Sequence, residues 1–146
     1  MRKLRLIASD TQDLSVMAAA VQDAIVNVGG IHFDAAARAL TLRMTRFRHE
    51  EASGKNKGQR VEAGLRIDGV LALQSRGIDR ENPDSFAVIL DVSFEPSDNP
   101  NEDPSGYLSL LLAGGGELRA NVEALDLILA DTDNDRMTKA MPSHDI

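Results

Sequence analysis

Basic side chains are concentrated in one segment of an otherwise acidic chain. Between residues 38 and 66 there are eight arginines and lysines against three acidic residues, so this segment carries +5 and the rest of the chain −12. Guanidinium groups bind carboxylates and phosphates through paired hydrogen bonds, so a cluster of them could recognise an acidic partner or a phosphorylated ligand. The predicted binding residues are Arg43, Arg46 and Arg48 on or near one strand, Lys55 and Lys57 in the following loop, and Arg76 and Arg80 further along.

The same residues have a simpler interpretation as a solvated strand face. Acidic neighbours that could pair with the arginines are present at Glu50, Glu51, Glu62 and Asp79. Exposed ion pairs of this kind are common on protein surfaces and contribute little. The basic cluster is therefore a hypothesis that depends on how the fold places these side chains.

An acidic run near the C-terminal end has part of a calcium-binding pattern. Asp131, Asp133 and Asp135 have the spacing that opens an EF-hand loop. Arg136 and Pro142 stand where that loop requires glycine and glutamate. The run is therefore interpreted as a solvated tail.

Other residues of catalytic type also lack a useful arrangement. The adjacent Ser-His-Asp of residues 143–145 cannot form a catalytic triad, which needs side chains brought together from separate positions. His49 precedes two glutamates in a polar loop, a combination that binds metals only weakly. Gly114–Gly116 lacks the Lys-Ser/Thr of a phosphate loop and is interpreted as a hairpin turn. We predict no catalytic residues, cofactor or metal site.

Composition restricts the class of protein. The chain has 146 residues, a net charge of −7, no cysteine and only five aromatic residues. An acidic surface repels phosphate, and so few rings cannot form a stacking platform, which makes nucleic acid an unlikely partner. No apolar run approaches the roughly 20 residues of a membrane helix. We expect a soluble cytoplasmic protein with one domain over residues 1–130 and a polar tail over 131–146.

Hydrophobic spacing predicts one helix near the N-terminus. Leu14, Met17, Ala18 and Val21 recur at three- and four-residue intervals, which is typical of an amphipathic helix. Ser9, Asp10 and Thr11 can cap it. The helix is predicted from about Thr11 to Gln22.

The remaining chain alternates apolar and polar residues with the period of two that strands require. Phe47 lies one residue out of phase, so its strand either ends at Thr45 or contains a bulge. Gly29-Gly30 predicts a tight hairpin turn, and Asp68-Gly69 a hairpin or bulge. Leu125–Ala130 fits a last strand better than a helix, although its leucines also suit a helical face. The expected strands cover residues 4–8, 25–28, 31–33, 40–45, 62–67, 70–74, 86–94, 108–112, 117–123 and 125–129.

Short connections between strands favour antiparallel pairing, because parallel neighbours need long crossovers. The predicted fold is therefore α+β and mainly antiparallel. It is a strongly curled sheet or partly open barrel of about seven to nine strands with one N-terminal amphipathic helix.

Several stretches together resemble DUF2948, a family of uncharacterised alphaproteobacterial proteins. They are LRLIASDTQDLSVMAAAVQDAIVNVG, TRFRHEEASG, RVEAGLRIDGVLALQSRGID, LSLLLAGGGELRANVEALDLILAD and PSHD. The resemblance follows the order of nearly the whole chain. It implies a cytoplasmic bacterial setting and assigns no functional residue, because the family has no assigned activity.

The leading functional hypothesis is a non-enzymatic binding or regulatory module that recognises a protein or an anionic small molecule through one face of its sheet. The alternatives are a small enzyme acting on an anionic substrate and an RNA-binding protein. A deep pocket with a carboxylate facing several arginines would favour the enzyme, whereas an open basic face would favour the module. Self-association through an exposed edge strand is also possible.

Overall fold

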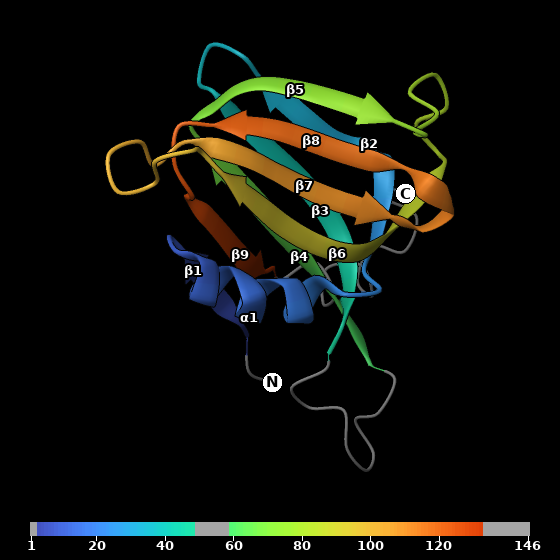
Figure 1. Cartoon of the computed structure of the whole chain (residues 1–146). Coiled ribbons are helices and arrows are strands. Elements are labelled where there is room, and N and C mark those ends of the chain that lie inside the picture. The colour runs from blue at the N-terminus through green and yellow to red at the C-terminus, as the bar shows by residue number, and fades with distance from the viewer. Residues whose placement is uncertain (1–2, 49–58, 133–146) are drawn as a thin grey trace.

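The computed structural model describes residues 3–48 and 59–132 (Figure 1). They form the one predicted α-helix and nine strands, within the predicted number, because the strands expected over residues 25–28 and 31–33 are a single strand. The helix is α1 (Thr11–Val21). The strands are β1 (Arg5–Ala8), β2 (Ile25–Asp34), β3 (Ala39–Phe47), β4 (Arg60–Asp68), β5 (Val70–Arg76), β6 (Phe86–Pro96), β7 (Gly106–Leu112), β8 (Glu117–Val122) and β9 (Leu127–Asp131).

All nine strands belong to one antiparallel sheet in the order β1-β9-β4-β3-β2-β6-β7-β8-β5. The sheet curls, so that β5, β6, β7 and β8 lie in front of the strands β2, β3, β4 and β9 (Figure 1). Strands β1 and β5 are its two edges, and they do not pair with each other. The predicted partly open, curled sheet is confirmed.

The core lies between the two halves of the curl. Each strand presents alternate residues inward, which the pleat of a β-strand requires. In β7 the inward residues are Leu108, Leu110 and Leu112, and in β3 they include Leu40, Leu42 and Met44. These side chains are at most 4% exposed, so the core is continuous from one half to the other.

Helix α1 covers one side of the curl. Its first turn is capped by Asp10, whose carboxylate accepts a hydrogen bond of 2.8 Å from the Asp13 amide. The buried face includes Leu14, Met17 and Val21, and the helix contacts β6, β1 and β3. It therefore joins the edge strand β1 to the other half of the sheet (Figure 1).

The chain crosses between the two halves at one end of the curl. Gly69, with a φ of 71°, lies between the end of β4 and the start of β5. Strand β4 is the third strand in the sheet order, whereas β5 is the last. The return from β8 to β9 runs beside Gly69, since the Glu123 amide donates to the Gly69 carbonyl and the Asp68 amide donates to the Asp126 carbonyl. The hairpin or bulge predicted at Asp68-Gly69 is therefore wrong. These residues form a turn between the two halves, because β4 and β5 do not pair.

The predicted turn at Gly29-Gly30 is wrong. Strand β2 runs through both glycines, and the turn comes after Asp34, where Arg38 has a φ of 55°. Between Val26 and Ile31 the register shifts, so that the four residues 27–30 of β2 lie opposite Arg43 alone in β3. The glycines allow close packing at this bend: a Cβ on Gly29 would lie 3.0 Å from the Pro83 carbonyl oxygen, and one on Gly30 would lie 3.2 Å from the Arg43 Cβ.

Both predictions for Phe47 are wrong as well. Strand β3 continues to Phe47, and its pairing with β4 is regular from Ala39 to Phe47. The inward position after Met44 is occupied by Arg46, which is fully buried. The apolar pattern breaks there because a charged residue occupies a core position. By contrast, the strand prediction for Leu125–Ala130 is confirmed by β9, and the hairpin at Gly114–Gly116 by the pairing of β7 with β8.

Candidate binding face

The outward side of β1, β9, β4 and β3 carries one row of paired residues with arginines at both ends. Arg5 pairs with Ala130, Ala130 with Gly64, and Gly64 with Arg43. Both arginines are exposed, and neither forms an ion pair with any residue in the described ranges. Two cations thus flank a floor with almost no side chains.

The floor between these arginines consists of Ala130 and Gly64 and carries no bulky side chain. A Cβ added to Gly64 would meet nothing within 4 Å, so the surface above it is open. Neighbouring strands lie about 4.8 Å apart, which places the Arg5 and Arg43 backbones roughly 14 Å from each other. Such a span suits an extended or flat anionic surface better than one small anion.

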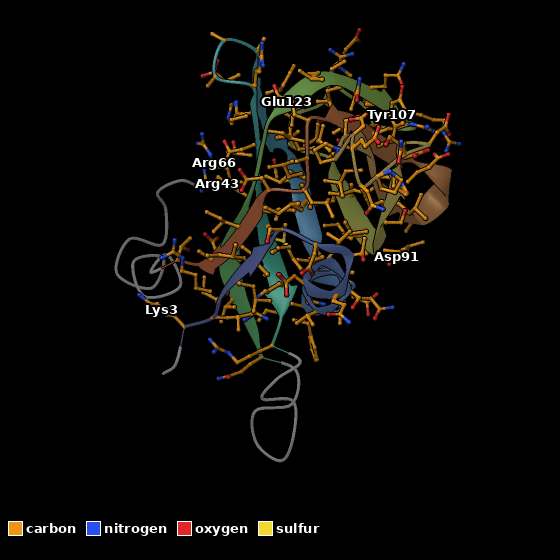
Figure 2. The ribbon with its side chains drawn as sticks, turned by 60° about the vertical axis from the view of Figure 1, so that its left-hand side comes forward. Lys3, Arg43, Arg66, Asp91, Tyr107 and Glu123 are labelled. Carbon is orange, nitrogen blue, oxygen red and sulfur yellow. The ribbon has the colours of Figure 1, made fainter. Side chains whose placement is uncertain are left out.

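Arg66 extends this surface in the next row. It pairs with Thr41 of β3 and Ile128 of β9, and its guanidinium lies 3.0 Å from the Asp68 carboxylate. Figure 2 shows Arg43 and Arg66 together on one side of the molecule, opposite Asp91 and Tyr107. We call the outward surface around Arg5, Arg43 and Arg66 the basic face.

Many acidic side chains lie away from the basic face. Glu62 and Asp68 are the two carboxylates on the outward side of β4. Others lie at the start of α1 and in the loop between β6 and β7, and include Asp10, Asp13, Asp98, Glu102 and Asp103. Arg5, Arg43 and Arg66 together with the two carboxylates on β4 leave the basic face a small excess of positive charge, which favours the approach of an acidic partner.

A hollow of about 520 Å³ lies beside Arg43, at the bend of β2. Its ionisable lining residues are Arg43, Glu62 and Asp84. Two carboxylates and one guanidinium do not favour an anion there. Anion binding by Arg43 is therefore expected on the side of Gly64.

Two of the predicted binding residues are inside the protein. Arg46 and Arg48 are 0% and 2% exposed. Arg46 donates two hydrogen bonds to the Asp131 carboxylate, at 2.8 Å from Nε and 2.9 Å from Nη2. The Leu4 amide donates to the same carboxylate at 2.9 Å. These arginines cannot join Arg43 on an exposed patch, because they point to the opposite side of β3.

The other predicted residues are also separated. Lys55 and Lys57 lie outside the described residues. Arg76 and Arg80 border a cleft beside β5, at the other edge of the sheet from β1. Of the five predicted residues that the structure describes, Arg43 alone lies on the basic face.

Sequence reasoning did not identify Arg5 and Arg66 as binding residues. Arg5 is 38 positions before Arg43 in the chain, and the two meet on one face only through β9 and β4. The sequence did contain one signal for them: Arg5 and Arg66 each stand next to an apolar residue, Leu6 and Leu65, that alternation places on the inward side of its strand. The register that aligns the strands cannot be obtained from that alternation alone.

Part of the acidic tail belongs to the sheet. Asp131 is the last residue of β9, and its side chain is 2% exposed. Its carboxylate binds Arg46 inside the protein and is not part of a solvated tail. Asp133, Asp135 and residues 143–145 lie outside the described residues, as does His49. Within residues 3–48 and 59–132, no group of three or more histidine, aspartate or glutamate side chains could hold a metal ion.

The helix α1 is too short to cross a membrane, and it is the one α-helix of the described chain. Comparison with curated proteins and with solved structures gives no match. The family model described as "Protein of unknown function (DUF2948)" matches residues 4–144. This match covers every strand and the helix, so the chain belongs to the DUF2948 family.

Proposed function

We propose that this protein is a non-enzymatic module that binds an acidic surface of a partner protein through the basic face. The observation that carries the proposal is the row Arg5–Ala130–Gly64–Arg43, in which two arginines without ion pairs among the described residues flank an open floor. The proposal includes a cytoplasmic location, with which a chain that forms no disulfide is compatible.

The shape of the surface supports a macromolecular partner. Small-molecule sites are concave and bury most of their ligand. The basic face instead presents its cations across the outward side of neighbouring strands, as an interface with a protein does. Arginine is enriched in such interfaces because its guanidinium binds carboxylates with two hydrogen bonds.

A comparison of matched variants tests this proposal. The face variant carries Arg5→Gln, Arg43→Gln and Arg66→Gln. The control variant carries Arg38→Gln, an exposed arginine that pairs with Glu123 and belongs neither to the residues that define the basic face nor to the lining of the cleft beside β5. Each tagged protein is used to capture partners from the native cell, with and without ribonuclease. We expect a discrete protein that the wild type and the control variant retain and the face variant loses, with affinity that falls as salt rises.

Three results would contradict the proposal. Retention of the partner by the face variant would place the binding surface elsewhere. Loss after ribonuclease treatment would indicate that RNA is the bound species. Failure to capture any protein, together with binding of an anionic metabolite, would favour the small-molecule alternative.

A further inference from the structure

The two edge strands of the sheet are protected to different extents. Strand β1 has four residues and is contacted by α1. Strand β5 has seven residues, contains neither proline nor lysine, and pairs with β8 alone among the described strands. Six of its seven residues are not buried. Exposed edges of this kind accept a further strand unless something blocks them.

The free edge of β5 borders a cleft of about 900 Å³. Residues Leu73–Arg76 form one wall, and the second half of β2, with Ile31 and Phe33, forms another. This half of β2 pairs with β3 on one side, while its pairing with β6 ends at Asn27. Two strand segments with unpaired edges therefore line the same cleft.

The cleft combines an apolar floor with a basic rim. Its apolar lining residues include Ile31, Phe33, Leu73 and Ile78. Its ionisable lining residues are Arg76, Arg80, Arg119 and Glu117, which together carry +2.

Not all of this positive charge is used within the protein. Arg76 pairs with Glu117 at 2.6 Å, and Arg119 lies 4.3 Å from the centre of the Tyr107 ring and 3.4 Å from Glu95. Arg80 forms no ion pair with a residue in the described ranges. The rim can therefore accept a carboxylate without breaking an existing contact.

We propose that this cleft binds an extended segment of a partner protein in which apolar and acidic residues alternate. The segment adds to the free edge of β5 through backbone hydrogen bonds, with apolar side chains toward Leu73 and Phe33 and carboxylates toward Arg76 and Arg80. Strand addition of this kind obtains affinity from the main chain and specificity from alternate side chains.

Charge favours such a segment over a second copy of this chain. Pairing of β5 with the β5 of another copy would bring a second set of arginines to a cleft that already has an excess of them. An acidic segment would neutralise that excess. This site is separate from the basic face, so it neither requires nor excludes the function proposed above.

The test uses the full chain and a synthetic seven-residue peptide of alternating glutamate and valine. A control peptide replaces glutamate with lysine. Two further peptides carry N-methyl groups on alternate backbone nitrogens. Because successive N–H groups of an extended peptide point to opposite edges, one of these peptides blocks one edge and the second blocks the other. Amide chemical shifts are followed by NMR during titration. We expect shifts in residues 70–76 and 30–34, no binding of the lysine peptide, and loss of binding for at least one N-methylated peptide.

Two variants locate the charge contacts. Arg80→Gln at the cleft rim is expected to weaken binding roughly threefold, typical of one exposed ion pair. Arg66→Gln, on the basic face, should bind the peptide as the wild type does.

The proposal is overturned if the shifts map to the basic face, if the lysine peptide binds equally, or if both N-methylated peptides bind as well as the parent. It is also overturned if sedimentation shows a dimer in which the amides of β5 are already protected from exchange. None of these four results would affect the partner-capture comparison, which depends on Arg5, Arg43 and Arg66.

Discussion

The guanidinium of Arg46 and the carboxylate of Asp131 face each other inside the sheet, joined by hydrogen bonds of 2.8 and 2.9 Å. Their side chains are 0% and 2% exposed. The pair links β3 to β9, which are separated in the sheet by β4. The Leu4 amide binds the same carboxylate, so the pair also fixes the approach to β1.

Removing one partner of this pair should strongly destabilise the protein. Asp131→Asn removes the buried carboxylate charge that faces the Arg46 guanidinium, and we expect a loss of about 3–5 kcal/mol in the free energy of unfolding. Urea unfolding measures it. The control Arg66→Gln breaks an exposed pair and should cost less than about 1 kcal/mol. A cost for Asp131→Asn as small as that of the control would contradict the buried pair.

Gly106→Ala should destabilise the pairing of β6 with β7. An added Cβ would contact the Glu95 carbonyl oxygen and the Phe94 ring, so the backbone would have to move. We expect a loss of about 1–3 kcal/mol, as for other overpacked sites. The matched change Gly64→Ala meets open space and should be neutral or stabilise by up to about 1 kcal/mol. Equal effects of the two changes on the urea midpoint would refute this interpretation.

The start of α1 depends on Asp10. Its carboxylate accepts a hydrogen bond from the Asp13 amide, one of the donors that the first helical turn leaves unpaired. Asp10→Ala should therefore cost about 1 kcal/mol of unfolding free energy, whereas Asp10→Ser should retain most of it. Thermal unfolding of both variants provides the measurement. The capping role would be rejected if serine and alanine had the same effect.

The exposed pair at the cleft should be visible in an acid titration. Hydrogen bonds from Arg76 and then Ser109 lower the pKa of Glu117 below its usual value of 4.5. A carboxyl with a lowered pKa stabilises the fold above its usual pKa and loses that contribution as pH falls through the lowered value. Arg76→Gln should raise the pKa of Glu117 toward 4.5, measured by carbon-detected NMR. An unchanged titration in this variant would show that Arg76 does not lower the pKa of Glu117.

The fold class followed from local patterns, whereas the site depended on long-range pairing. Alternation and short connections predicted the antiparallel curled sheet, because each strand buries its own apolar side. Arg46 escaped this reasoning because a charged side chain is expected outside, and the carboxylate that compensates its burial is 85 residues away. Gly29-Gly30 also misled it, since glycine favours both a turn and a close backbone approach, and Pro83 decides between them only in the folded chain.

The pairing of β1 with β9 has a consequence for biosynthesis. Arg5 and Ala130 are 125 positions apart, and β9 lies between β1 and β4. Until residues 127–131 leave the ribosome, β4 has one unpaired side and β1 has no neighbouring strand. Contacts of such long sequence separation slow folding to the millisecond-to-second range. Strand β9, the last strand of the described residues, therefore completes the sheet, and the edge of β4 is open to pairing with other chains until then.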